Sequence, residues 1–208
     1  FTEWTNVTRA LPQFMGHYQP KLPGDLGFYD LRVIDTMRKQ ADLAKHYGLA
    51  GFCMYYYWFG GKRLLDLPQR QLLDNPDLDF PFCLCWANEN WTRRWDGQEA
   101  DVLMAQDYSP EDDVAMIDDL SPSFLDRRYI RIDGRPLFMV YRPTVIPDIA
   151  ASMTAWRQRF RELGLGEPFI VMPQVFGQVD PRPMGFDAAA GFPPHGGWDI
   201  ADDRHRLQ

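Results

Sequence analysis

Residues 80–96 read FPFCLCWANENWTRRWD, an apolar run of strand length that passes directly into a polar and aromatic segment. The chain has four further apolar runs of this kind, at residues 50–59, 136–141, 168–176 and 186–192. All five lack the polar and apolar alternation of half-exposed strands, which is typical of parallel strands covered by helices. Amphipathic stretches of helix length lie between the runs, so the sequence predicts an α/β fold with a parallel sheet.

Three helices and one tight turn are predicted, one helix before the first of these strands and the other elements between later ones. The apolar spacing of residues 30–47 and 149–163 is helical, and each stretch ends at a glycine, Gly48 or Gly164. The stretch 109–120 opens with Ser-Pro and three acidic residues, which suits the start of a helix. Asp133-Gly134, between residues of alternating polarity, predicts a small hairpin.

The pattern of strands alone leaves two architectures open, a doubly wound sheet and part of an eight-stranded barrel. A dinucleotide-binding sheet has a glycine-rich phosphate turn after its first strand. The Gly60-Gly61-Lys62 sequence after residues 50–59 matches neither that turn nor a P-loop. A nucleotide cradle of either type is therefore not indicated.

Length and charge narrow the classes of function. With 208 residues and a formal net charge of −7, the chain has the size of one globular domain and lacks the basic balance of a nucleic-acid-binding protein. No apolar run reaches the roughly 20 residues of a membrane span, and no signal segment opens the chain, so we expect a cytoplasmic protein without a membrane span. Because the chain starts at Phe1 within dense sequence, we expect it to be a piece of a longer protein.

The cysteines predict neither a disulfide scaffold nor a metal site. Cys53, Cys83 and Cys85 are odd in number and lie within apolar runs, and their spacing is poor for zinc. We expect buried, inert thiols. No His, Asp and Glu cluster has metal-ligand spacing, and no cofactor is predicted.

The residues that follow the strands predict a carbohydrate site, because the carboxyl ends of parallel strands gather the functional groups of α/β folds. Three Trp, two Asn, two Arg and two carboxylates fall within residues 86–96. Indole and phenol rings pack on sugar faces, while amides and charged groups bind hydroxyls. For Tyr55 and Phe59 we favour a core role.

Two carboxylates are the candidate catalytic residues, Glu89 and Asp96. Glu89 could act as general acid, as base or nucleophile, or as an anchor for hydroxyls, and the alternative is a structural ion pair with Arg93 or Arg94. Asp96 precedes Gly97 and equally suits a turn. The predicted substrate-binding residues are His17, Tyr18, Tyr57, Trp58, Trp86, Asn88, Asn90, Trp91, Arg93, Arg94, Trp95, Gln174 and His195. The first two lie in residues 1–30, which read as a long loop that forms a wall of the site.

Several of these strings carry a family resemblance. They are FTEWTNV at 1–7, GHYQP at 16–20, LGFYDL at 26–31, YYWF at 56–59, WANENWTRRWDG at 86–97 and GFD at 185–187. In these strings the chain resembles the WbsX-type proteins, a glycosyltransferase-like family related to family 99 glycoside hydrolases. The match extends to about His195, so we expect a WbsX-like domain over residues 1–195 and a polar tail over 196–208.

The resemblance implies a (β/α)8 TIM barrel, here incomplete, that acts on glycosidic bonds by transfer or hydrolysis in the synthesis of bacterial surface polysaccharide such as O-antigen and lipopolysaccharide. It implies a glycan substrate and leaves a nucleotide-sugar donor open. An opening Tyr-Leu-Pro-Gln-Phe-His strand and an Asn-Glu-Trp-x-Glu motif of the family are missing, and Gly191 replaces an acidic residue. The alternative is therefore a non-catalytic glycan-binding module or an inactive barrel segment. A partial barrel would associate with itself or with the remaining barrel segments.

Overall fold

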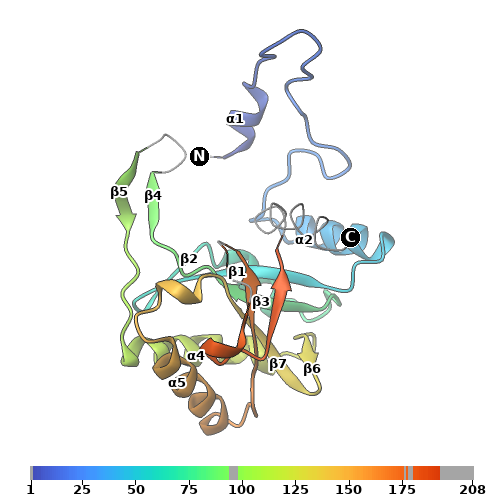
Figure 1. Ribbon diagram of the computed structural model, residues 1–208. Helices are drawn as coiled ribbons and strands as arrows, with labels where there is room; N and C mark the ends of the chain where they lie inside the picture. The colour runs from blue at the N-terminus through green and yellow to red at the C-terminus, as the bar shows by residue number, and fades with distance from the viewer. Residues whose placement is uncertain (1, 94–97, 176, 178–179, 193–208) are drawn as a thin grey trace, which may run out of the picture. The chain divides into compact units, whose positions relative to one another are not determined.

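The computed structural model describes residues 2–93, 98–175, 177 and 180–192. The chain divides into two compact units, residues 1–49 and 50–208. Figure 1 shows the helices and strands of both units along the chain. None of the helices in the described residues combines the length and apolar character that a membrane crossing requires.

The first unit contains two helices, α1 (Trp4–Thr8) and α2 (Ile34–His46), joined by irregular chain. The short α1 lies inside the stretch predicted as a loop. Its Trp4 indole donates a hydrogen bond to the Tyr29 carbonyl at 3.0 Å and packs edge-on against Phe28, so both ends of the stretch are tied together. The predicted end of α2 is confirmed, because Gly48 adopts a φ of 74° and the last carbonyls accept bonds from residues 48 and 49.

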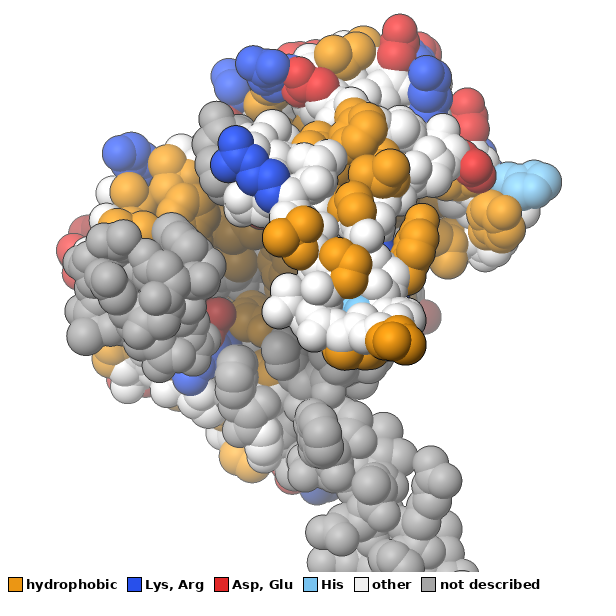
Figure 2. Space-filling view, turned by 90° about the horizontal axis from the view of Figure 1, so that it is seen from above, with side chains coloured by type: hydrophobic (Ala, Val, Ile, Leu, Met, Phe, Trp, Pro, Cys, Tyr) orange, Lys and Arg blue, Asp and Glu red, His pale blue; other side chains and the backbone are white. Residues whose placement is uncertain are grey.

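This unit exposes many large hydrophobic side chains, including Leu11, Phe14, Met15 and Leu22. Figure 2 shows hydrophobic side chains at the surface among polar ones on the face that it views. Exposed apolar side chains mark protein interaction sites where they form a contiguous patch. Association of the chain with itself or with other segments stays a prediction.

The second unit is built on a mostly parallel sheet, which confirms the predicted α/β class. The sheet has the order β2-β1-β3-β7-β8-β9, with β6 paired to β7. The five predicted runs form its parallel strands, which are β1 (Phe52–Phe59), β3 (Phe82–Trp86), β7 (Arg135–Val140), β8 (Phe169–Gln174) and β9 (Ala188–Gly191). In the described residues the sheet runs from β2 to β9 without closing into a barrel.

Helices α4 (Pro110–Leu125) and α5 (Ile149–Glu162) pack on one face of this sheet (Figure 1). Trp156 of α5 contacts the rings of Trp86 and Phe138, and Phe124 of α4 also packs on Phe138. Ser109 caps α4 by accepting a bond from the Asp112 amide at 3.1 Å, as its sequence predicts. The opposite face carries a second apolar cluster formed by Cys85, Met139, Tyr141, Val171 and Val175.

Several short elements were not foreseen from the sequence. They are β2 (Lys62–Leu64), α3 (Leu67–Asp74), the β4 (Trp91–Arg93) and β5 (Gln98–Met104) hairpin, η2 (Pro143–Val145) and η3 (Arg182–Met184). Gly60 and Gly61 both have positive φ and make the turn from β1 to β2. The hairpin predicted at Asp133-Gly134 is confirmed by β6 (Arg131–Ile132) and β7, and both turn residues have positive φ.

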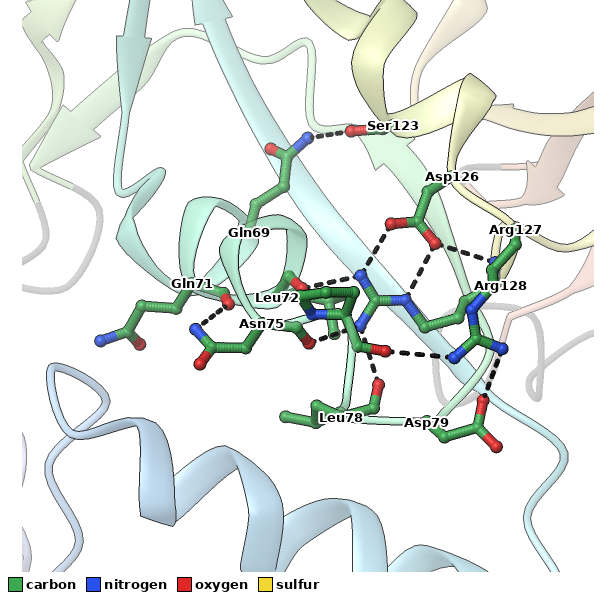
Figure 3. A network of polar contacts seen from close by, with 11 residues as sticks. Gln69, Gln71, Leu72, Asn75, Leu78, Asp79, Ser123, Asp126, Arg127 and Arg128 are labelled. Atoms are coloured by element: carbon green, nitrogen blue, oxygen red, sulfur yellow. Dashed lines mark hydrogen bonds and ion pairs between the residues drawn. The ribbon is translucent and has the colours of Figure 1, made fainter.

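A buried guanidinium fixes the connection from α3 to β3 (Figure 3). The side chain of Arg128 is 2% exposed, and it donates hydrogen bonds to the carbonyls of Leu72, Asn75 and Leu78 at 2.8 to 2.9 Å. Asp126 accepts two further bonds, at 2.7 and 2.9 Å, and balances the charge. All five donors of an arginine lie in one plane, so a single side chain can satisfy carbonyls from three points of a loop.

Replacing Arg128 by Met is expected to lower the free energy of unfolding by about 3–5 kcal/mol, because it leaves buried carbonyls and a carboxylate without their donor. Urea denaturation measures the change. Arg127→Met is the matched control. Arg127 and Asp79 form an ion pair in which the side chains are 67% and 70% exposed, so the control should lose less than about 1 kcal/mol. Equal losses in the two variants would contradict the role assigned to the network.

Candidate functional site

Two charged side chains come together at the ends of β3 and β7, Glu89 after β3 and Arg142 after β7. The backbone pairing of β3 and β7 ends where the Tyr141 amide donates to the Trp86 carbonyl at 3.0 Å. Beyond this bond, the side chain of Asn88, two residues after Trp86, pairs with the backbone of Arg142. Its Oδ1 accepts a bond from the Arg142 amide at 2.7 Å, and its Nδ2 donates to the Arg142 carbonyl at 2.8 Å.

Asn88 is fully buried, with 0% of its surface exposed. Tyr108, in the segment before α4, donates its hydroxyl proton to the Asn88 carbonyl at 2.7 Å. Burial raises the pKa of Tyr108 to about 12, so this phenol stays a donor. Asn88 was predicted to bind substrate, but its polar side-chain atoms are used inside the protein. Its position supports a role in holding the ends of the strands rather than in contact with a ligand.

The Asn88 clamp places Glu89 beside Arg142. Arg142 Nη1 donates to Glu89 Oε1 at 2.6 Å, and both side chains are less than one-third exposed, at 28% for Arg142 and 29% for Glu89. A carboxylate in this setting accepts hydrogen bonds and can still be reached from solvent. The prediction had Arg93 or Arg94 as the ionic partner. Arg142 was not predicted as a site residue, although it follows a predicted strand directly, which is the feature that identified Glu89.

Aromatic rings form a row on the face of the sheet opposite α4 and α5. Trp91 of β4 packs edge-on against Tyr57 and Phe59 of β1, with centroid distances of 5.3 and 5.4 Å. From Tyr57 the row continues through Tyr55 and Tyr141, each step with centroids 6.1 Å apart. Burial raises the pKa of Tyr55 to about 12 and also raises that of Tyr57, so both hydroxyls remain neutral donors at neutral pH.

Alternation along the strands separates this row from two tryptophans that were also predicted to bind substrate. Trp58 follows Tyr57 and faces the helices, where its indole donates to Asp112 at 2.9 Å. Trp86 is buried between Tyr108 and Trp156. Both indoles therefore pack in the core between the sheet and its helices, on the opposite side of the sheet from the aromatic row.

The remaining predicted residues have varied surroundings. Asn90 is exposed and accepts a bond from the Gln106 amide at 2.7 Å, which ties the start of β4 to the chain after β5. Gln174 ends β8 and is partly buried. In the first unit, the His17 ring accepts a bond from the Gln13 amide at 3.1 Å and stacks on Phe14, and Tyr18 is exposed. The Arg93 side chain and the residues Arg94, Trp95, Asp96 and His195 lie outside the described part of the chain.

The cysteines differ in part from their prediction. Cys83 and Cys85 are buried, whereas Cys53, on the same sheet face opposite α4 and α5, is exposed. Among the described residues, no group of three or more His, Cys, Asp and Glu side chains has an arrangement that suits a metal ion.

Three comparisons relate this architecture to known proteins. The model of the family described as "Glycosyltransferase WbsX" matches residues 1–207. Two proteins named "Uncharacterized protein WxcX", from Xanthomonas campestris pv. campestris strain B100 and strain ATCC 33913, are each 51% identical to the chain over 195 residues. These residues are 94% of this chain and 28% of the relatives, so the chain spans little more than a quarter of their length.

A solved structure named "Glycoside hydrolase-like protein" resembles the fold, with a TM-score of 0.51 and 15% sequence identity. The likeness covers 76% of this chain and 48% of that one. At this identity the comparison concerns the fold alone.

Replacing Asn88 by Ala is expected to lower the free energy of unfolding by about 2–4 kcal/mol, because it leaves the amide and the carbonyl of Arg142 without partners in the interior. Asn90→Ala serves as control, since this exposed residue accepts one bond and should lose less than about 1 kcal/mol. Urea denaturation compares the two. An Asn88 variant as stable as the Asn90 variant would refute the clamp.

Proposed function

Because this chain belongs to the glycosyltransferase WbsX family, we propose that its strand ends form the saccharide site of an enzyme that acts on glycosidic bonds. The observation that carries the proposal is the Glu89–Arg142 pair at 2.6 Å. Both residues lie close in sequence to members of the aromatic row, since Arg142 follows Tyr141 and Glu89 lies two residues before Trp91. A sugar ring needs both kinds of group, because its C–H faces pack on aromatic rings and its hydroxyls bind charged side chains.

In this proposal each partner of the pair has a definite task. Glu89 accepts hydrogen bonds from sugar hydroxyls, or takes up a proton from the attacking hydroxyl during transfer. Arg142 orients the Glu89 carboxylate and places a positive charge beside the site, which suits a glycan hydroxyl or a phosphate of a nucleotide-sugar donor. Tyr57 and Trp91 form the floor on which the sugar lies. Asp96, outside the described residues, stays the candidate for a second carboxylate, which glycoside chemistry usually requires.

We further propose that the parallel strands are one part of a (β/α)8 barrel whose other strands lie elsewhere in a longer protein. Two findings support this. The strands add to the sheet in the order in which they occur along the chain, as they do in such barrels. The chain also spans only 28% of its WxcX relatives and 48% of the glycoside hydrolase-like structure. The proposed process, synthesis of bacterial surface polysaccharide, is carried over from the family resemblance.

The second candidate is a glycan-binding module without catalytic activity. The observation that favours it is the ion pair itself, since a Glu89 carboxylate bonded to Arg142 can hold the strand ends or bind hydroxyls without taking part in a reaction. The two candidates differ in turnover, because both bind a saccharide and only the enzyme converts it.

Trp91→Ala is expected to weaken saccharide binding by this chain about tenfold, or about 1.4 kcal/mol, because it removes an aromatic face on which the sugar would pack. Titration calorimetry against bacterial surface oligosaccharides measures the affinity. Tyr47→Ala removes an exposed ring of the first unit and should bind like the unchanged chain. Equal binding by all three proteins would contradict a sugar platform at Trp91.

In the longer protein that contains this chain, Glu89→Gln is expected to reduce glycosyl transfer or hydrolysis at least about 100-fold. Its melting temperature should stay nearly unchanged, since a partly exposed ion pair contributes about 1 kcal/mol or less. Glu167→Gln is the matched control, because Glu167 also pairs with arginines but lies between α5 and β8. It should keep full activity. A large fall in the melting temperature of the Glu89 variant would favour a structural ion pair, and binding without turnover by the unchanged protein would favour the module.

A further inference from the structure

The Tyr108 hydroxyl bonds to the peptide group that leads into Glu89. It donates to the Asn88 carbonyl at 2.7 Å, and this carbonyl belongs to the peptide bond between Asn88 and Glu89. The same hydroxyl accepts a longer bond, of 3.4 Å, from Asn88 Nδ2. A peptide group is planar, so a bond to its oxygen restricts the whole unit, including the amide nitrogen of Glu89. Tyr108 therefore acts on the backbone of Glu89, whereas the Asn88 side chain acts on that of Arg142.

A second bond holds the chain on the other side of Glu89. The Gln106 amide donates to Asn90 Oδ1 at 2.7 Å, so the residues before and after Glu89 are both bonded to residues 106–108. The Gln106 side chain donates from Nε2 to the Trp58 carbonyl, near the end of β1, at 2.9 Å. Residues 106–108 thus connect the end of β1 to the segment that carries Glu89.

Tyr108 is itself held by the core. Its ring packs edge-on against the buried Trp86, with the centroids 6.0 Å apart. Ser109, the next residue along the chain, caps α4. A hydrogen-bonding group whose side chain is locked by packing can hold a neighbour within the narrow tolerance that a binding or catalytic site requires.

We propose that Tyr108 is a positioning residue, which holds Glu89 where it meets both Arg142 and the saccharide. The proposal rests on the function proposed above, in which Glu89 contacts the saccharide. Without the hydroxyl, the peptide before Glu89 loses the bond from Tyr108, and the carboxylate is held less firmly at its 2.6 Å contact with Arg142. A misplacement of about 1 Å can lower a reaction rate about 100-fold, so a small shift of this carboxylate should be visible in the kinetics.

The alternative is a tyrosine that only stabilises the fold, and Tyr129 supplies the comparison. Its hydroxyl also donates to a backbone carbonyl, that of Leu137, at 2.7 Å, and it accepts a bond from the Leu84 amide. Tyr129 pairs with Phe82 at the start of β3, so it lies at the opposite end of this strand from Glu89. Tyr129→Phe therefore removes the same group at a point that the saccharide proposal does not use.

A double-mutant cycle in the longer protein that contains this chain tests the proposal. Tyr108→Phe is expected to lower kcat/KM about tenfold. In the Glu89→Gln background the same replacement should cause no further loss, because a positioning residue has no effect once the group that it positions is gone. Its effect on the melting temperature, a fall of about 2–4 °C, should be the same in both backgrounds.

Tyr129→Phe is the matched control. Its melting temperature should fall at least as far as that of Tyr108→Phe, because its hydroxyl makes two hydrogen bonds to the backbone, and its kcat/KM should stay unchanged. For a glycan-binding module without turnover, the same cycle is read in saccharide affinity by titration calorimetry of this chain.

Three results would overturn the assignment of Tyr108 while the proposed function stands, each in a protein that Glu89→Gln inactivates. They are full activity of Tyr108→Phe, equal losses by Tyr108→Phe in both backgrounds, and an equal loss by Tyr129→Phe. Unchanged activity and affinity of Glu89→Gln would instead contradict the proposed function, and the role of Tyr108 with it.

Gln106→Leu decides the question if Tyr108→Phe does not fold. It releases residues 106–108 from the Trp58 carbonyl and leaves the ring of Tyr108 on Trp86. We expect a smaller loss of kcat/KM, about threefold, that again disappears in the Glu89→Gln background. A loss that persists in that background would refute the role assigned to this segment.

Discussion

The candidate site depends on one buried side chain, the amide of Asn88. Beyond Trp86 and Tyr141 the backbones of β3 and β7 no longer pair with each other. The Asn88 side chain instead accepts a hydrogen bond from the Arg142 amide and donates one to the Arg142 carbonyl. An amide is suited to this task because it offers one acceptor and two donors without carrying a charge into the interior. This contact fixes the backbone at the ends of β3 and β7, and it thereby brings Glu89 close to Arg142.

The sheet divides the aromatic residues of the chain into two groups with different surroundings. Neighbours along β1 point to opposite faces, so Tyr57 joins the aromatic row while Trp58 lies under α4 with its indole bonded to Asp112. Trp86, on β3, belongs to the second group and packs on Trp156. The same kind of residue therefore forms the aromatic row on one face and the helix-covered core on the other.

Much of the fold could be predicted because it depends on local signals. Apolar runs marked all five parallel strands, and glycines at positive φ marked the ends of α2 and α5. The β4–β5 hairpin was missed because its strands carry mixed polar residues without regular alternation. For the site, proximity to a strand end marked Glu89, but only the pairing of β3 with β7 shows that Arg142 is its partner. The exposure of Cys53 was missed for a related reason, since composition cannot tell which of three thiols on one sheet face are covered by their neighbours.

The Arg128 network has a consequence for how this protein can vary. Its guanidinium recognises main-chain carbonyls of Leu72, Asn75 and Leu78, which every amino acid provides. Substitutions along that connection would therefore leave the recognised atoms in place, provided that the path of the chain is kept. We expect relatives to vary in sequence between α3 and β3 while they retain an arginine at position 128 and an acidic residue at position 126. The backbone path of this connection would then be conserved although its side chains are not.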